Sequence, residues 1–267
     1  MKRIVVLYGS PRKETGVRAA RTFIDELVRL EPVDVREIFL FQEASDFCRG
    51  CFRCFTVGET ACPHHKTIGP LVQAMDEADG LVLVSPVYSL QMSGTMKAFL
   101  DHLSYCFINH RPRFYKKHAM VIVTTAGAGA GAVAKSLKQI LTFWGVNRIE
   151  TLGIRAQAIS WEDMSPGVRQ KARRRLKAKA RRFHRDLSSG SLRPPRMMQL
   201  MMFAAGKVLA GTLEPDNPDR VYWEQMGWSD PTVVSFHPDI PVGPARRVLV
   251  RGIQVLLSEM WTGRDRV

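Results

Sequence analysis

The feature that most constrains the fold is a regular alternation of short apolar runs with helically spaced segments. Five runs rich in Val, Ile and Leu lie at residues 3–10, 33–40, 80–89, 118–125 and 147–157. Segments with helical spacing lie at residues 17–30, 68–79, 93–106, 132–145 and 165–187. Strands buried on both faces carry apolar residues continuously, and a helix between consecutive strands allows parallel pairing. The order therefore predicts an α/β fold, a doubly wound five-stranded parallel sheet with helices on both faces.

The alternation stops near residue 189, so residues 190–267 are predicted to form a helical C-terminal extension. Segment 196–211 is rich in Met and apolar almost all round, and segment 243–261 is amphipathic. A buried helix at a subunit interface is the favoured interpretation of the Met-rich segment, with a membrane-surface helix or a lid as alternatives. In the turn-rich segment between them, Trp223 and Trp228 either shape a pocket or anchor the extension.

Composition and the N-terminus indicate a globular cytoplasmic protein. The apolar share is 45% and the charged share 24%, as in ordinary globular domains. The first apolar run is too short for the core of a signal peptide, and no apolar run approaches the length of a spanning helix. In the cytoplasm cysteines stay reduced, so a cysteine cluster indicates metal or redox use rather than disulfides.

Much of the positive charge lies in one predicted helix. The chain carries a net charge of +14, and residues 169–185 contain ten Lys or Arg and no acid. An apolar stripe at helical spacing indicates that this helix packs on the sheet and exposes its charges. Without interleaved aromatic residues or a DNA-binding motif, nucleic-acid binding is disfavoured. The remaining candidate partners are anionic lipid, as a peripheral membrane contact, and the phosphate of a soluble cofactor. The stripe consists of Val168, Ala172, Leu176, Ala180, Phe183 and Leu187.

Three loops that follow predicted strands are rich in Gly, Ser, Thr or Pro. They lie at 9–17, 85–91 and 124–131, and the carboxyl ends of parallel strands share one edge of a sheet, where ligands bind. In the first loop, "GSPRKETG", small residues expose backbone amides at a helix N-terminus, which suits a monophosphate. The loop matches neither a Walker A motif nor the GxGxxG fingerprint. The alternative is a polar turn without a ligand.

Four stretches in order resemble the NADPH-dependent FMN reductase superfamily of flavodoxin-like proteins. They are "GSPRK", the cysteine segment, "EADGLVLVSPVYSLQMSGTMKAFLDH" and "TAGAGAG", and the resemblance covers about residues 1–187. The cysteine segment is similar to that of the archaeal and bacterial iron–sulfur flavoproteins. Two positions depart from the family pattern: "ETGVR" stands where Asn is usual, and His102 stands where Arg is common.

The resemblance implies a flavodoxin-like FMN-binding domain over residues 1–189, with the cysteine loop at 47–63. It implies a loop that holds the FMN phosphate, a strand end that flanks the isoalloxazine ring, and a Gly/Ala loop that closes the other side. The phosphate loop would use Ser10, Arg12, Thr15, Gly16 and Val17, the ring would lie against Pro86, Val87, Tyr88 and Ser89, and the closing loop would use Thr125, Gly127 and Gly129.

The cysteine segment reads C-x2-C-x2-C-x7-C and ends with a proline. Iron–sulfur clusters are held by four thiolates, commonly in closely spaced runs of this kind, whereas structural zinc more often uses two separated pairs. The spacing therefore predicts a four-iron four-sulfur cluster on Cys48, Cys51, Cys54 and Cys62. The alternative is a set of cysteines retained without a cluster. His64 and His65 follow, either as further ligands or as exposed loop residues.

Together these features predict an FMN-dependent NAD(P)H oxidoreductase. Reduced nicotinamide would pass hydride to the flavin, and the flavin would reduce a small-molecule or protein acceptor, with the cluster as an intermediate carrier. This chemistry needs no side-chain acid or base, so no catalytic residue is named. The resemblance implies a homo-oligomer, a dimer or tetramer. A non-catalytic electron carrier and a regulatory nucleic-acid- or membrane-associated module are the alternative functions.

Overall fold

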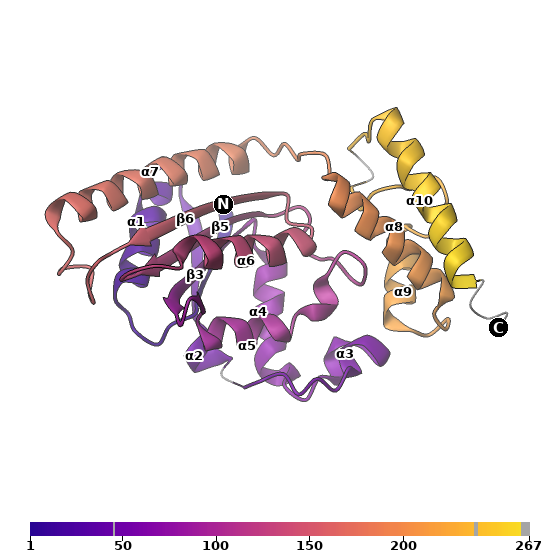
Figure 1. Cartoon of the computed structure of the whole chain (residues 1–267), viewed down its shortest axis with the longest axis horizontal. Coiled ribbons are helices and arrows are strands. Elements are labelled where there is room, and N and C mark those ends of the chain that lie inside the picture. Colours follow the sequence, from indigo (N-terminus) through magenta and orange to yellow (C-terminus); the bar gives the residue numbers. More distant parts are fainter. Residues whose placement is uncertain (45, 238–239, 263–267) are drawn as a thin grey trace.

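The computed structural model describes residues 1–44, 46–237 and 240–262 of the chain. Its centre is a twisted sheet of five parallel strands in the order β2-β1-β3-β5-β6, with β4 paired antiparallel to β3 (Figure 1). This order is the flavodoxin-like arrangement of a doubly wound sheet, so the predicted fold class is confirmed. The strands are β1 (Lys2–Tyr8), β2 (Val33–Phe39), β3 (Gly80–Tyr88), β4 (Gln91–Met92), β5 (His118–Thr125) and β6 (Arg148–Arg155).

Helices follow the strands as the spacing predicts, with shorter ones between them. The short elements α2, α3, α9 and two 3-10 turns were not predicted, because segments this short are not long enough to show a helical period. The predicted helix 93–106 is divided, since α5 ends at Asp101 and a 3-10 turn follows. The helices are α1 (Thr15–Leu30), α2 (Leu40–Glu43), α3 (Arg53–Thr56), α4 (His65–Glu77), α5 (Gly94–Asp101), α6 (Ala130–Phe143), α7 (Pro166–Ser188), α8 (Met197–Thr212), α9 (Pro218–Gln225) and α10 (Pro244–Thr262), and the 3-10 turns are Glu59–Ala61 and Ser104–Cys106.

Alternate residues of the central strands enter two separate cores. In β1, Val5 and Leu7 pack with α4, α5 and α6, while Ile4 and Val6 pack with α1 and α7 on the opposite face. Successive side chains of a strand point to opposite faces, so a continuous apolar run needs a helical layer on each side. The two layers hold the carboxyl ends of the strands together at one edge.

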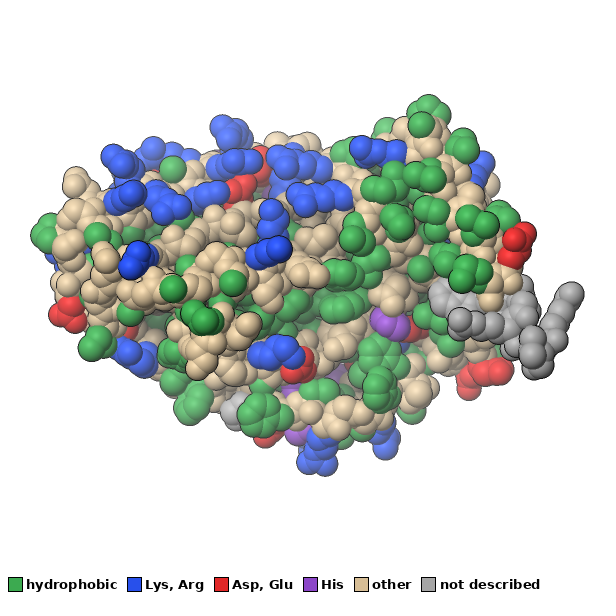
Figure 2. All heavy atoms as spheres, in the orientation of Figure 1, with side chains coloured by type: hydrophobic (Ala, Val, Ile, Leu, Met, Phe, Trp, Pro, Cys, Tyr) green, Lys and Arg blue, Asp and Glu red, His purple; other side chains and the backbone are tan. Residues whose placement is uncertain are grey.

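The basic helix α7 packs as its apolar stripe predicts. Five of the six stripe residues are buried and Val168 is half-buried against α1 and the sheet. Many of its charges are neutralised by acids of neighbouring elements. Glu26 accepts from Arg181 at 2.8 Å and lies near Lys177, and Glu150 pairs with Lys179 and Arg182. Lys and Arg side chains gather along the outer surface of the molecule over this helix (Figure 2).

The C-terminal extension has its own aromatic core. Trp223 and Trp228 are fully buried with Phe203 and Phe236, and the indole of Trp223 donates a hydrogen bond to the carbonyl of His110. The two tryptophans therefore anchor the extension to the loop between α5 and β5. The domain boundary at 189/190 stays a prediction, and residues 238–239 and 263–267 of the predicted extension lie outside the described residues.

None of the described helices combines the length and the apolar composition needed to cross a bilayer. In α8, Leu200, Phe203 and Ala204 are buried within the molecule, whereas Met198 and Met201 are exposed. The Met-rich segment is therefore an internal helix with one exposed edge.

Candidate functional site

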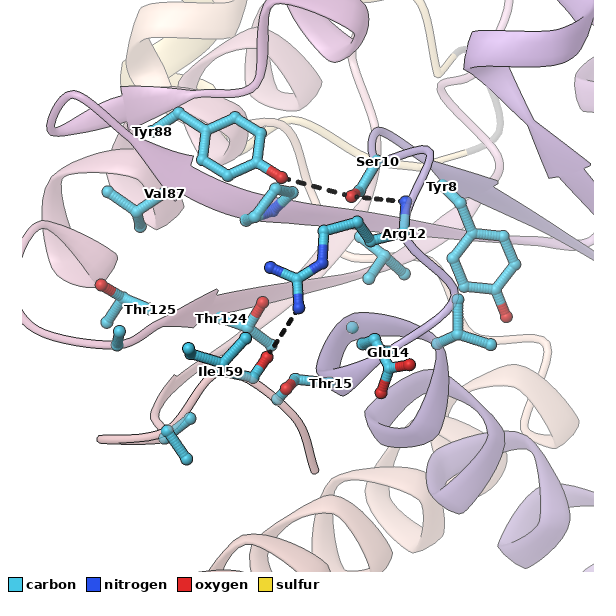
Figure 3. Close-up of a pocket in the computed structure, with 17 residues that line it drawn as sticks. Tyr8, Ser10, Arg12, Glu14, Thr15, Val87, Tyr88, Thr124, Thr125 and Ile159 are labelled. Atoms are coloured by element: carbon cyan, nitrogen blue, oxygen red, sulfur yellow. Dashed lines mark hydrogen bonds between the residues drawn. The ribbon is translucent and has the colours of Figure 1, made fainter. Parts of the chain in front are cut away.

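The predicted strand-end loops meet around a cavity of about 190 Å³ at the carboxyl ends of β1, β3, β5 and β6 (Figure 3). Its walls come from the β1–α1 loop, the end of β3, the end of β5 and the segment after β6. Nine of the twelve predicted cofactor-binding residues line it: Ser10, Arg12, Thr15, Gly16, Val17, Pro86, Val87, Tyr88 and Thr125.

The other three predicted residues, Ser89, Gly127 and Gly129, do not line the cavity. Ser89 and Leu90 both have positive φ, +47° and +62°, and form the two-residue turn of the β3–β4 hairpin. Ser89 therefore lies at the tip of the hairpin. Gly129, at φ +89°, lets the loop approach Val87, because a Cβ there would lie 2.9 Å from the Val87 Cγ1 atom. These residues shape the loops that carry the lining residues.

The β1–α1 loop offers backbone donors at one end of the cavity. The first backbone bond of α1 runs from Arg18 to Glu14, so the N–H groups of Thr15, Gly16 and Val17 have no partner within the helix. The helix N-terminus adds partial positive charge. Gly9 lets the loop pass closely over α5, because a Cβ there would lie 2.7 Å from the Ser93 hydroxyl and 2.8 Å from Met96.

Charged and hydroxyl side chains of the same loop point across the cavity. The Arg12 guanidinium donates to the carbonyl of Ile159 at 3.0 Å, and Ser10 Oγ lies 3.4 Å from the Tyr88 hydroxyl. Glu14 also lines the cavity (Figure 3), so the departure from the family pattern places a carboxylate beside the amide cluster. An anion bound there would meet three amides and one guanidinium, with the Glu14 carboxylate nearby.

Several lining residues were missed by sequence reasoning. The segment after β6 could have been found by the rule that strand ends share one edge, whereas Tyr8 and Val84 lie within strands whose side chains were assigned to the core. Burial, together with a 2.6 Å hydrogen bond to Glu37, raises the pKa of Tyr8 well above its usual range, so its phenol stays neutral. The missed residues are Tyr8, Glu14, Val84, Thr124, Ala126, Ala156, Ala158 and Ile159.

The cavity therefore combines two binding environments. Unpaired amides and a guanidinium suit a phosphate group. Beside them, Pro86, Val87 and Ala126 provide a mainly apolar wall suited to a flat ring system, with backbone groups of the strand ends available for orientation.

The cysteine segment lies outside the strands and the long helices, with only α3 and a 3-10 turn as regular structure. Cys48 and Cys51 are exposed, while Cys54 and Cys62 are half-buried. Backbone at Gly50 and Phe52 has positive φ, and the Gly50 amide points to the Cys48 sulfur at 3.5 Å. Burial raises the pKa of the Cys54 thiol, and the positive charge of Arg111 acts in the opposite direction. In this arrangement the described residues contain no group of three or more His, Cys, Asp or Glu side chains that could hold a metal ion.

A buried arginine holds the cysteine segment to the rest of the molecule. The Arg111 guanidinium donates to the carbonyl of Cys54 and forms an ion pair with Asp219 of α9. Both charged side chains are nearly inaccessible to solvent, at 4% and 6% exposure. Glu59 lies 3.5 Å from Arg111 and 2.9 Å from Arg113. Arg111 thus links Asp219 of the extension to the cysteine segment.

Comparison with known proteins gives a family match over the same part of the chain. Residues 2–156 match the family model of the NADPH-dependent FMN reductases. An iron–sulfur flavoprotein of Archaeoglobus fulgidus is 33% identical over 150 residues, which cover 55% of this chain and 64% of the relative. One from Methanocaldococcus jannaschii is 32% identical over 103 residues, covering 37% of this chain and 50% of the relative. The chain thus spans half to just under two thirds of these relatives.

Solved structures match the fold. The apo form of an NADH:FMN oxidoreductase superposes with a TM-score of 0.55 at 20% identity, covering 73% of this chain and 97% of that one. An FMN-dependent NADH-azoreductase from Bacillus anthracis, in complex with FMN, superposes with a TM-score of 0.55 at 14% identity and covers 69% of this chain and all of that one. At these identities the likeness supports the shared fold.

Proposed function

The chain belongs to the NADPH-dependent FMN reductase family, and on that premise we propose that it is an FMN-dependent oxidoreductase that takes electrons from NAD(P)H. One observation carries the proposal. The cavity at the strand ends places the free amides of Thr15, Gly16 and Val17 and the guanidinium of Arg12 beside an apolar wall. FMN has the matching parts, a terminal phosphate and a flat ring system.

The binding roles follow from this placement. The FMN phosphate would accept from the α1 amides, the Ser10 and Thr15 hydroxyls and Arg12, and the ring would lie against Pro86, Val87 and Tyr88 with Thr125 opposite. Ser89, Gly127 and Gly129 would act through the shape of their loops.

When bound, the flavin supplies the redox chemistry, accepting hydride from reduced nicotinamide and passing electrons to an acceptor. The chain's own residues bind and orient. No side-chain acid or base is assigned to them. Burial, together with its bond to Glu37, raises the pKa of Tyr8 further above neutral pH, so its neutral phenol adds no charge to the cavity.

The four-cysteine cluster remains part of the proposal. Its support is the four thiols of Cys48, Cys51, Cys54 and Cys62, the Gly50 amide directed at the Cys48 sulfur, and the similarity to archaeal iron–sulfur flavoproteins. Seating a cubane would require the exposed half of the segment to bring its thiols together. A cluster there would carry single electrons toward the acceptor.

The proposed setting is cytoplasmic, where the thiols stay reduced, and the proposed assembly is a homodimer or homotetramer. The oligomer is supported by a row of exposed apolar side chains on the outer face of α10, which a second copy would cover. They are Val248, Leu249, Val255, Leu256 and Met260.

The test is anaerobic purification followed by an absorption spectrum, iron and sulfide analysis, and steady-state NAD(P)H oxidation. We expect bound FMN and turnover with a quinone or azo acceptor. A flavin spectrum without iron or sulfide would retire the cluster alone, whereas bound FMN without turnover with any acceptor would favour the electron-carrier function.

A matched pair of variants tests the binding site. Arg12→Gln removes the guanidinium that crosses the cavity, and charged hydrogen bonds of this kind contribute about 1.5–3 kcal/mol, or roughly 10- to 140-fold in FMN affinity. Arg18→Gln removes the same charge from an exposed position of α1 outside the cavity and should change affinity by less than about twofold. Quenching of flavin fluorescence measures both, and equal losses would place the phosphate elsewhere.

A further inference from the structure

A second hollow lies at the opposite edge of the sheet, where the strands begin. It measures about 410 Å³ and lies between the end of α6, the start of β6, the linker 193–196 and the first turns of α8 and α10. Figure 1 shows α10 beginning beside the linker that leads from α7 into α8. The hollow is therefore bounded by both the flavodoxin-like sheet and the extension, far from the cavity at the carboxyl ends of the strands.

Three arginines are among the residues that line this hollow. Arg193, Arg196 and Arg246 line it, and no acidic side chain of the described residues does. Within residues 1–44, 46–237 and 240–262, none of the three forms an ion pair. The contrast with α7 is informative, because many cations of that helix pair with acids. Unneutralised charge in a concave surface concentrates a positive potential.

The backbone that carries two of these arginines is fixed to the core. The Asn147 side chain accepts from the Arg193 amide and donates to the Arg193 carbonyl, both at 2.9 Å. The buried Gln199 side chain accepts from the Arg196 amide at 3.0 Å and donates to the carbonyl of Thr142 at 3.2 Å. Side-chain amides thus clamp the linker so that the arginine Cα positions are set before a ligand arrives, which lowers the entropy cost of binding.

An apolar hollow adjoins the charged one. It measures about 390 Å³, shares Pro194, Pro195 and Arg246 with the first, and is otherwise lined mainly by Pro241, Val242 and Pro244. A ligand that fits both would carry an anionic group at one end and an apolar portion at the other. Arginine forks match phosphate oxygens two at a time, and three guanidinium groups suit a dianion better than a single carboxylate.

We propose that this pair of hollows binds a phosphate monoester that carries an apolar portion. The phosphate lies among Arg193, Arg196 and Arg246, and the apolar portion lies against the proline-lined wall. Both a free amphipathic metabolite and the headgroup of a phospholipid present this chemistry. Because the site joins the sheet to the extension, its ligand would also fasten the extension to the sheet.

The experiment uses the full chain with FMN in excess, so that the α1 phosphate loop is not the site measured. Octyl phosphate and inorganic phosphate are titrated by isothermal calorimetry at constant ionic strength. The test variant is Arg193→Gln/Arg196→Gln/Arg246→Gln. The control, Arg173→Gln/Arg174→Gln/Arg247→Gln, removes the same charge at exposed positions outside the hollows, and circular dichroism verifies that both variants are folded.

We expect saturable binding of octyl phosphate at one site, tighter than that of inorganic phosphate. The test variant should weaken it by roughly tenfold or more, and the control by less than about twofold. Non-saturable binding, equal losses in both variants, or equal affinity for succinate would overturn the proposal. Flotation with phosphatidylcholine vesicles containing phosphatidic acid separates the sources: arginine-dependent flotation identifies a lipid headgroup, and octyl phosphate binding without flotation identifies a free metabolite.

Discussion

The cavity at the strand ends and the cysteine segment are two candidate redox regions that are built in different ways. The cavity is formed by the ends of long, regular elements, and its binding groups are largely backbone amides and small residues. The cysteine segment has only short helical turns and is held by contacts of Arg111 with residues about 50 to 110 positions away in the sequence. One region takes its geometry from secondary structure, the other from a few buried charges. Disturbing either kind of support should therefore have different consequences.

The largest expected effect comes from removing the charge that supports the cysteine segment. Asp219→Asn leaves Arg111 buried without its main counterion, and breaking such a pair typically costs about 3–5 kcal/mol. Urea unfolding should show this loss. Hydrogen exchange should accelerate in residues 46–63 before it does in the sheet, because Arg111 also holds the Cys54 carbonyl.

The same helix provides the matched control. Glu224→Gln breaks the Arg220–Glu224 pair, in which the glutamate is 52% exposed, and such surface pairs contribute at most about 0.5 kcal/mol. Similar losses in both variants, or unchanged exchange at the cysteine segment in Asp219→Asn, would show that this segment is supported in some other way.

This difference also explains what could be predicted from sequence. The apolar runs predicted the sheet and both helical layers, because periodicity and burial are local properties of the chain. The strand-end rule predicted which loops meet, and the family resemblance implied the nine residues that line the cavity. The pairing of Arg111 with Asp219 spans more than a hundred residues, and no local pattern marks it. The prediction that Ser89 lies beside the ring did not take account of the two-residue hairpin turn at 89–90. Serine and leucine are not usual residues at positive φ, so the sequence gives no signal for this turn.

A pH-dependent loss of stability should arise within the regular half of the molecule. Burial, aided by the charge of Arg148, lowers the pKa of His118 from 6.5 to about 4. Between these values the unfolded chain binds the proton and the folded chain does not. The free energy of unfolding should therefore fall as the pH drops from about 6.5 to about 4, by on the order of 3 kcal/mol in total.

Replacing His118 by leucine should remove this contribution. Both ring nitrogens are buried without a hydrogen-bond partner among the described residues, so leucine leaves no polar group unsatisfied. Denaturant unfolding across this pH range measures the slope. The control His184→Gln alters a more exposed histidine and should retain the slope, while a persistent slope in the leucine variant would assign the proton uptake to another group.

Glycine packing provides a test of the cavity's backbone. In Gly9→Ala the new Cβ would lie 2.7 Å from the Ser93 hydroxyl and 2.8 Å from the Met96 Cβ, and overpacking of this kind costs about 1–3 kcal/mol. The β1–α1 loop would shift, so FMN affinity should fall together with stability. In Gly127→Ala no atom lies within 4 Å of the position that the Cβ would occupy, so this control should change neither FMN affinity nor stability. Unchanged FMN binding in Gly9→Ala would show that the β1–α1 loop is not part of the FMN site.

The smallest effect concerns the carboxylate at the edge of the cavity. Glu14 lines the same cavity as the free amides of α1, and its charge opposes a phosphate by on the order of 1 kcal/mol at about 4 Å when water screens the pair. Glu14→Gln should therefore tighten FMN binding roughly fivefold at low salt, with the gain shrinking as salt is added. Asp25→Asn removes an equal charge from an exposed position of the same helix outside the cavity and should leave affinity unchanged. An equal gain in both variants would mean that net charge alone is responsible, whereas a gain confined to Glu14→Gln would place the phosphate beside the α1 amides.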